Sequence, residues 1–217
     1  MPFPESTTDV APPAVATTAL LTVQGLACRR GERLLFRGLD FALLPGQVLW
    51  LRGRNGCGKT SLLRILAGLS SPDAGTVRQG GRPAYLAHSN ALKDDLSVLE
   101  SLQFLALLHG GAADAATCGA ALRRAGLHDR RHAPVRTLSQ GQRRRVALSR
   151  LFLQTAARVW ILDEPFDALD SDAVSTLNQA LQDHARAGGG VVLTSHLDLT
   201  LDDPLPTVLQ LDQLARA

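Results

Sequence analysis

A glycine-rich run at residues 53–60 offers the clearest chemistry in the sequence. It fits the pattern G-x-x-x-x-G-K-[ST]. Glycines let backbone N–H groups close around phosphate oxygens, and the start of a helix adds the positive end of its dipole. We therefore expect Lys59 to reach the outer phosphates of a nucleotide and the Thr60 hydroxyl to reach Mg²⁺. The residues expected to contact the nucleotide here are Gly53, Arg54, Asn55, Gly56, Cys57, Gly58, Lys59, Thr60 and Ser61.

The alternative reading of this run, a glycine-rich turn that binds nothing, fits its surroundings poorly. An apolar segment at residues 48–52 predicts a strand before it, and the spacing of aliphatic residues over 59–67 predicts a helix after it. A phosphate loop requires this order of strand, loop and helix. Cys57 lies near the start of that helix, where thiolates are favoured, so we expect an oxidation-sensitive spectator rather than a catalytic group.

Two carboxylates end a second apolar segment, at residues 159–162. Asp163 and Glu164 follow it directly, and ligands of open α/β sheets bind at the carboxyl ends of strands. We expect Asp163 to hold Mg²⁺, directly or through water, and Glu164 to polarise an attacking water as general base. Without the phosphate loop, an ordinary surface turn would be a serious alternative for the same two residues.

The elements that must position these residues alternate between strands and helices. Strands are expected at 20–26 (an edge strand), 33–41, 48–52, 84–87, 159–162 and 191–195, with loop and turn at 70–81. Helices are expected at 59–67, 141–156 and 172–187. Residues 97–137 are expected to be helical throughout, with breaks at Gly110-Gly111 and Pro134. Strands at both ends therefore enclose a helical block near residues 91–140, which predicts an α/β core with a helical insertion.

Length and composition indicate one domain after a short tail. The chain has 217 residues and a net charge of +3, which is too small by itself to indicate a nucleic-acid surface, so no nucleic-acid partner is expected. The proline-rich residues 1–18 lack the basic start of a signal peptide and are expected to form a disordered tail, which leaves 19–217 as the domain. No run approaches the roughly 18 apolar residues of a membrane span. Three widely spaced cysteines indicate neither a disulfide framework nor a zinc site.

The segment Leu-Ser-Gln-Gly-Gln at residues 138–142 resembles the LSGGQ signature of ABC transporter ATPases, with Gln140 in place of the first glycine. Residues 166–170 resemble the D-loop of that family, and residues 194–196 resemble its switch-histidine segment. The resemblance implies a P-loop NTPase core of ABC ATPase type, with an antiparallel β edge and a helical subdomain. It also implies that ATP is the nucleotide and that the chain forms a head-to-tail homodimer, with each ATP between the phosphate loop of one copy and the signature of the other. The further site residues implied by the resemblance are His196, Ser139, Gln140, Gly141, Gln142 and Asp170.

A narrower resemblance links the chain to the haem-exporter ATP-binding subunits of cytochrome c biogenesis, through residues 33–36, 85–88, 90–96 and 99–102. It implies membrane permease subunits as partners, a place on the cytoplasmic face of the bacterial inner membrane, and ATP use tied to haem delivery. His88 stands where the ABC family usually has a glutamine that reaches Mg²⁺ and the attacking water. Neutral imidazole offers one donor and one acceptor and could copy part of that role; the alternative is that His88 only hydrogen-bonds within its loop. The family also usually stacks an aromatic side chain on adenine near Arg30. This sequence has none there, so either an arginine stacks in its place or adenine is recognised weakly.

Three other functions stay open at the level of sequence. The ATPase subunit of another ABC importer or exporter would share every ATP-site residue and differ only within residues 85–102. A non-transport ABC ATPase acting on DNA or ribosomes usually carries long coiled coils or a second fused ATPase domain, and the sequence indicates neither. A P-loop kinase would lack the signature and the switch histidine.

Overall fold

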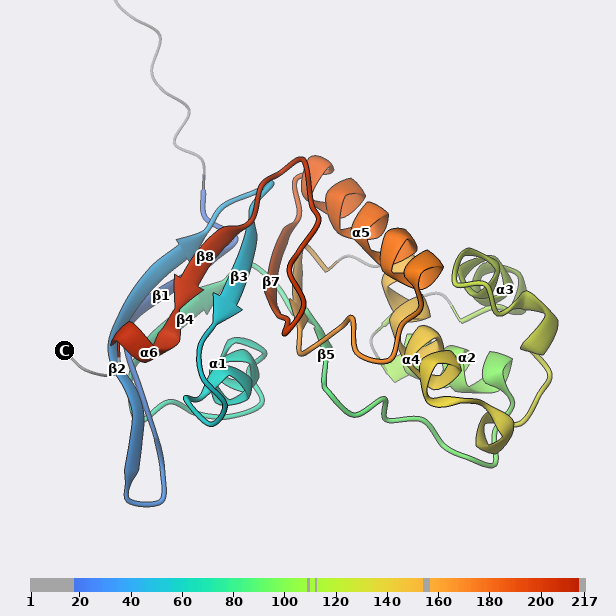
Figure 1. Cartoon of the computed structure of the whole chain (residues 1–217), viewed down its shortest axis with the longest axis horizontal. Coiled ribbons are helices and arrows are strands. Elements are labelled where there is room, and N and C mark those ends of the chain that lie inside the picture. The colour runs from blue at the N-terminus through green and yellow to red at the C-terminus, as the bar shows by residue number, and fades with distance from the viewer. Residues whose placement is uncertain (1–17, 109, 112, 154–156, 215–217) are drawn as a thin grey trace, which may run out of the picture.

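A computed structural model describes residues 18–108, 110–111, 113–153 and 157–214 of the chain. The tail predicted for residues 1–18 lies, apart from Thr18, outside this part of the chain. The described residues form two sheets with helices around them, and a further group of helices lies beyond the end of the larger sheet (Figure 1).

The larger sheet has five strands in the order β5-β6-β7-β3-β8, and every pairing within it is parallel. Its strands are β3 (Val48–Arg52), β5 (Ala84–Leu86), β6 (Val159–Leu162), β7 (Gly190–Thr194) and β8 (Thr207–Gln210). In β3, Val48 and Trp50 pack into the core on one face, while Leu49 and Leu51 pack into the core on the other. Burial on both faces explains why the central strands are continuous apolar runs, which made them predictable.

The smaller sheet is antiparallel, in the order β2-β1-β4, and consists of β1 (Leu21–Arg30), β2 (Arg33–Leu43) and β4 (Ala74–Gln79). The predictions of an edge strand at 20–26 and of a loop over 70–81 are both wrong, because β4 pairs with β1 and makes β1 the middle strand. Every residue of β4 is exposed or only half-buried, so this strand has no apolar pattern and depends on backbone pairing. Gly75 is needed there because a Cβ would collide with the backbone of Gln24 and Gly25.

Two helices cover the faces of the parallel sheet (Figure 1). Helix α1 (Lys59–Leu66) follows the phosphate loop and packs with both sheets in one core cluster through Leu62, Leu63, Ile65 and Leu66. Helix α5 (Ser171–Arg186) belongs to the core cluster on the opposite face, together with Trp50 and Trp160. The start of α1 is thereby fixed against the end of β3, which is what a phosphate loop requires.

A third core lies among α2 (Val98–Leu108), α3 (Ala115–Arg124) and α4 (Gln140–Ser149). The 3₁₀ turns η1 (His128–Arg130) and η2 (Val135–Thr137) join α3 to α4, so the stretch 97–137 is not helical throughout. The helix predicted to reach residue 156 ends at Ser149 and continues as the turn η3 (Arg150–Phe152), and residues 154–156 lie outside the described residues. The short elements β8 and α6 (Leu211–Leu214) had not been predicted. The α/β fold with an antiparallel sheet and a group of helices is confirmed, whereas the boundaries of a helical subdomain at 91–140 remain a prediction.

Candidate nucleotide site

The phosphate loop joins β3 to α1, and its glycines adopt backbone conformations that other residues rarely adopt. Gly58 caps α1 with a φ of 109°, a conformation that favours glycine, and a Cβ there would come within 3.1 Å of Leu35. Lys59 Nζ donates hydrogen bonds to the carbonyl oxygens of Gly53 (2.7 Å) and Arg54 (3.4 Å). The ammonium group therefore lies within the loop, where it can exchange these carbonyls for phosphate oxygens.

Asp163 lies where two hydroxyl groups meet at the end of β6. Thr60 Oγ1 donates to Asp163 Oδ2 and Thr194 Oγ1 donates to Asp163 Oδ1, each at 2.9 Å. Asp163 is almost completely buried. Mg²⁺ in nucleotide sites takes one or two protein oxygens and completes its shell with phosphates and water. The adjacent oxygens of Thr60 and Asp163 fit such an ion.

Glu164 is held in an unusual backbone conformation beside His196. Its φ is 48°, in the left-handed region, and its N–H donates to Thr194 Oγ1 at 2.9 Å. The N–H of His196 donates to Glu164 Oε2 at 3.0 Å, and His196 Nε2 lies 3.4 Å from Oε1. Burial raises the pKa of Glu164 above its ordinary value, and the neighbouring His196 opposes the rise. A carboxylate of raised pKa suits a general base.

His88 reaches the same cavity from the loop after β5. Its side chain is largely exposed, and Nδ1 lies 3.5 Å from Asp167 Oδ2. Asp167 was not among the predicted site residues, although it lies in the segment that resembles a D-loop. The contact joins two loops and does not lie within the loop of His88, and the ring also lines the cavity, so its expected role as a substitute for glutamine stays a prediction.

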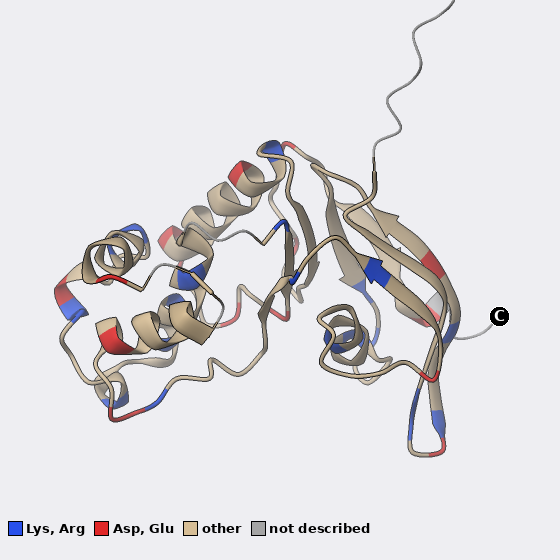
Figure 2. Cartoon of the chain, turned by 180° about the vertical axis from the view of Figure 1, so that it is seen from behind, with Lys and Arg blue, Asp and Glu red and all other residues tan. Residues whose placement is uncertain are grey.

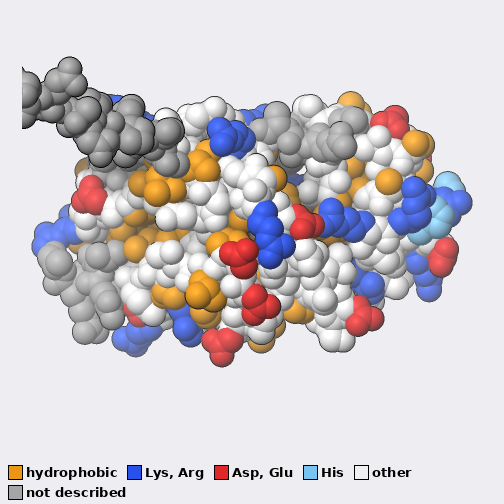
Figure 3. All heavy atoms as spheres, turned by 90° about the horizontal axis from the view of Figure 1, so that it is seen from above, with side chains coloured by type: hydrophobic (Ala, Val, Ile, Leu, Met, Phe, Trp, Pro, Cys, Tyr) orange, Lys and Arg blue, Asp and Glu red, His pale blue; other side chains and the backbone are white. Residues whose placement is uncertain are grey.

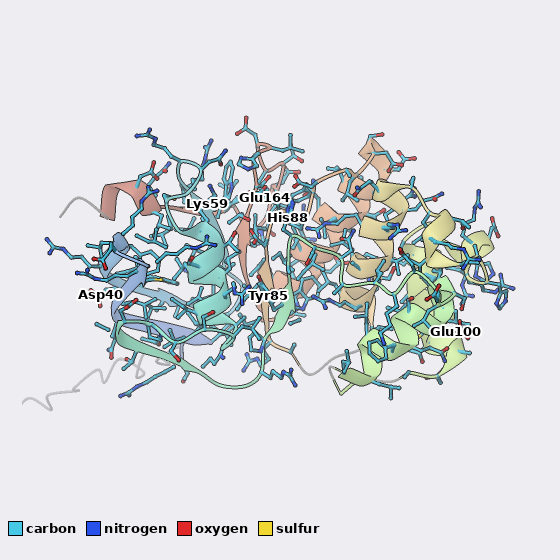
Figure 4. The ribbon with its side chains drawn as sticks, turned by 90° about the horizontal axis from the view of Figure 1, so that it is seen from below. Asp40, Lys59, Tyr85, His88, Glu100 and Glu164 are labelled. Carbon is cyan, nitrogen blue, oxygen red and sulfur yellow. The ribbon has the colours of Figure 1, made fainter. Side chains whose placement is uncertain are left out.

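A cavity of about 500 Å³ brings the chemically active residues together. Figure 4 shows Lys59, Glu164 and His88 close to one another in the middle of the molecule. The β1–β2 hairpin, whose tip carries both basic and acidic residues (Figure 2), contributes Arg30 and Arg33. No Phe, Tyr or Trp of the described chain lines this cavity. The lining residues are Arg30, Arg33, Leu35, Asn55, Gly56, Gly58, Lys59, Thr60, Ser61, His88, Asp163, Glu164, Asp167 and His196.

The signature residues lie elsewhere. Ser139 and Gln142 cap the start of α4 reciprocally: Ser139 Oγ accepts from Gln142 N–H at 3.2 Å, and Gln142 Oε1 accepts from Ser139 N–H at 3.0 Å. Asp170 caps α5 by accepting from Ala173 N–H at 3.0 Å. Neither these three residues nor Gln140 and Gly141 line the cavity of the phosphate loop. Gln140 lines a separate groove with His88 and Leu138.

Cys57 differs from its expected chemistry. Burial raises the pKa of its thiol, and the charge of Lys59 only partly opposes this. The protonated thiol is therefore favoured over the thiolate, so the expectation that the helix start would favour a thiolate is wrong, because burial outweighs the charge near the helix.

The sequence pattern of the ABC transporter family matches residues 36–167, which is more than half of the chain. The chain belongs to the ABC transporter family. The curated relatives of this family member include the "Cytochrome c biogenesis ATP-binding export protein CcmA" of Aromatoleum aromaticum, 49% identical over 93% of this chain and 99% of that protein. The protein of the same name in Cupriavidus necator is 43% identical over 90% of each chain.

Solved structures share the fold of this ABC family member. A putative ABC transporter ATP-binding protein from Pyrococcus furiosus superimposes with a TM-score of 0.76 over 90% of this chain and 98% of that one, at 23% identity. The ATP-binding subunit of another ABC transporter gives a TM-score of 0.73 at 25% identity, over 82% of this chain and 80% of that one. The family assignment makes the chain an ABC-type ATPase subunit. Within the described residues, the helices all fall short of the length and apolar character that crossing a bilayer demands.

Proposed function

We propose that this chain hydrolyses ATP to drive an exporter that serves cytochrome c biogenesis, and that haem is the group delivered. The observation that carries the proposal is the arrangement at the end of β6, where Glu164 and His196 stand beside the Thr60–Asp163 pair. The names of the relatives are the basis for proposing cytochrome c biogenesis as the process. The local likeness of residues 85–102 to haem exporters is the basis for proposing haem as the transported group.

Each residue has a separate task in the reaction. Lys59 and the loop amides hold the outer phosphates, while Thr60 and Asp163 hold Mg²⁺, which neutralises charge on the phosphates when bound. Glu164 takes a proton from the attacking water, and its general-base role accounts for about 10²–10⁴-fold of the rate. His196 keeps Glu164 oriented through two contacts and faces the outer phosphate. His88 replaces the usual glutamine beside the water.

Two copies of the chain are proposed to complete the site. Within one copy the signature segment (residues 138–142) and Asp170 stand outside the cavity that holds Lys59 and Glu164. The capped start of α4 has the positive end of its helix dipole free for the nucleotide of a second copy. A head-to-tail homodimer places these residues against the partner's outer phosphate.

The helical group is the proposed docking face for membrane permease subunits at the cytoplasmic side of the inner membrane. Helix α2 exposes Phe104, Leu107 and Leu108, and the groove that begins at His88 continues past Leu92 to Leu138. These apolar groups favour a protein partner. On the face in Figure 3 basic and acidic side chains are interspersed.

Replacement of the chromosomal copy by Glu164→Gln tests the function. Purified Glu164→Gln is expected to bind ATP and lose most hydrolysis, and the cells are expected to lose c-type cytochromes that carry covalent haem, measured by haem staining of periplasmic fractions. Wild-type protein should co-purify with permease subunits. Normal c-type cytochromes in cells whose ATPase is lost would assign the subunit to another ABC importer or exporter.

A further inference from the structure

Arg144 is a buried cation that the reaction scheme above does not use. It lies on α4, one and a half turns after the cap residue Ser139, and only 3% of it is exposed. Burial lowers the pKa of Arg144, and the charges of Asp167, Asp163 and Glu164 only partly oppose this, although the structure records no salt bridge of Arg144 within the described residues. Burying a charge without a counter-ion costs several kcal/mol unless hydrogen bonds satisfy the group. The contacts that satisfy Arg144 therefore identify what it does.

One edge of the guanidinium group holds the loop after β5. Nη1 donates to the carbonyl oxygens of Ala87 (3.0 Å) and His88 (3.3 Å) and to Oδ1 of Asn90 (3.1 Å). All three acceptors lie within four consecutive residues. This loop carries His88 into the nucleotide cavity and also lines the groove proposed for the membrane partner.

The other edge holds the turn after β6. Nη2 donates to the carbonyl oxygens of Asp163 (2.8 Å) and Glu164 (2.6 Å), and Nε donates to that of Pro165 (3.4 Å). Glu164 is the residue with a φ of 48°. A backbone conformation of this kind persists only where surrounding contacts impose it. The hydrogen bonds to Asp163, Glu164 and Pro165 are such contacts.

Arginine is suited to this position in a way that lysine is not. Its planar group carries five N–H donors in a fixed fork, so it can serve two loops at once, whereas the ammonium group of lysine is a point donor on a flexible stem. Because Arg144 is on the signature helix, its hydrogen bonds connect α4 directly to the carbonyl oxygens of Glu164 and His88.

We propose that Arg144 is a positioning residue for ATP hydrolysis, which fixes the Glu164 turn and the His88 loop to the signature helix of the same chain. The inference rests on the proposed function. Arg144 acts through the backbone of these residues and does not touch the nucleotide. It sets the rate of hydrolysis without setting nucleotide affinity, and it carries movement from the helical group to the catalytic turn.

The test compares Arg144→Gln and Arg144→Lys with the matched control Arg124→Gln in purified full-length protein. Arg124 also bridges the helical group to the core, through a 3.0 Å ion pair with Asp183, but it lies outside the nucleotide cavity. The turnover number kcat is normalised to titrated nucleotide sites, and KM for ATP and the Kd of a fluorescent ATP analogue are measured. A misplaced catalytic group can reduce the rate by up to about 100-fold, so Arg144→Gln is expected to lose roughly 10- to 100-fold in kcat with KM and Kd within about twofold of the control. Arg144→Lys is expected to recover part of the loss.

A second variant, Asn90→Ala, removes one hydrogen-bond acceptor of Arg144 and leaves its bonds to the backbone carbonyl oxygens. It can therefore test the proposal even if Arg144→Gln does not fold. It is expected to lower kcat less than Arg144→Gln does, at unchanged KM. If Arg144→Lys and Asn90→Ala both match Arg124→Gln in kcat per nucleotide site, Arg144 only stabilises the fold and the proposal is wrong. If wild type and Arg124→Gln themselves fail to hydrolyse ATP, the proposed function fails and takes this inference with it.

Discussion

Thr194 connects the carboxylate of Asp163 to the backbone of Glu164 through one hydroxyl group. It donates to Asp163 Oδ1 and accepts from the N–H of Glu164, both at 2.9 Å, and it is fully buried. A hydroxyl can do both at the same time because it has one donor and two acceptor lone pairs. Valine has the same shape and neither function.

Thr194→Val is therefore expected to leave two buried polar groups without a partner, which lowers the free energy of unfolding by about 1–3 kcal/mol. It is also expected to reduce ATP hydrolysis, because the turn at Glu164 loses one of its restraints. Thr194→Ser keeps the hydroxyl and is the control. Urea unfolding and steady-state hydrolysis measure both effects, and equal stability of the Val and Ser variants would contradict the assigned role.

Single residues were predictable from sequence where a local pattern defines their task. Lys59 and Thr60 stand in a motif, and Asp163 and Glu164 end an apolar run, so the structure brings them together as expected. The roles of Thr194 and Arg144 were missed because their partners lie far away in the sequence. Thr194 is 31 residues from Asp163, and Arg144 is 57 residues from Ala87. Arg144 stands in the run Arg143-Arg144-Arg145, and nothing in that run distinguishes its buried member.

At the scale of elements, the start of α4 packs directly against the segment before α5. A Cβ at Gly141 would lie 2.5 Å from the carbonyl oxygen of Ala168, whose own φ is 61°. The glycine thus allows two backbones to approach closely. Gly119 in α3 is also buried in a helix, but its nearest neighbour would be a flexible arginine atom at 3.9 Å.

This pair of glycines gives opposite expectations for the same substitution. Gly141→Ala must displace backbone and is expected to destabilise the protein by about 1–3 kcal/mol. Gly119→Ala fits without strain and is expected to stabilise it by about 0.5–1 kcal/mol, since alanine loses less conformational entropy in a helix. Chemical denaturation of both variants without nucleotide measures the difference. A stable Gly141→Ala variant would show that α4 and Ala168 are not in close contact.

His184 joins α5 to β6 by stacking on Trp160, with ring centroids 3.9 Å apart and an interplanar angle of 9°. Burial lowers the pKa of His184 below its usual value of 6.5. Above that value both the folded and the unfolded chain hold a neutral ring. As the pH falls below about 6.5, the unfolded chain binds the proton first, so this contribution to stability is lost until the pH reaches the lower pKa of the folded state.

His184→Phe keeps a stacked ring and removes the titration. The free energy of unfolding of wild type is therefore expected to fall more steeply between pH 7 and pH 5 than that of His184→Phe, with the two compared by urea unfolding at each pH. Parallel pH profiles for the two proteins would mean that His184 does not titrate differently on folding.

Strands were predictable from sequence where burial requires an apolar run. They were not predictable where only backbone pairing with a neighbouring strand forms them. The strands β3, β6 and β7 are buried on both faces and were correctly located from their apolar runs. By contrast β4 and β8 contain no fully buried residue, and their positions follow from neighbours far along the chain. For the same reason the sequence could not show that β1 has a partner on each edge.

At the scale of the whole molecule, the distance between the phosphate loop and the signature segment makes a test of the homodimer possible. In the proposed head-to-tail homodimer, two Lys59→Ala chains or two Ser139→Arg chains would leave a lesion in every site. In the mixed dimer one site carries both lesions and the other carries none. Mixing the two inactive proteins is therefore expected to restore hydrolysis, measured as phosphate release and compared with each parent protein alone.

Loss of the Ser139 cap by itself costs about 1 kcal/mol of stability, so folding of that variant is checked by its retained nucleotide binding. Full activity of either parent homodimer would contradict the composite site.

The place of β3 in the middle of its sheet has a consequence for how the protein is made. Both neighbours of β3, the strands β7 and β8, follow it in the sequence only after the whole group of helices. As the chain leaves the ribosome, β3 and the phosphate loop that follows it emerge early and wait for partner strands that have not yet been synthesised. Pairing over such long separations is slow, and domains form as units. The nucleotide cavity therefore forms only after β7 and the following His196 have been synthesised, so a nascent chain that ends before them is expected not to hydrolyse ATP.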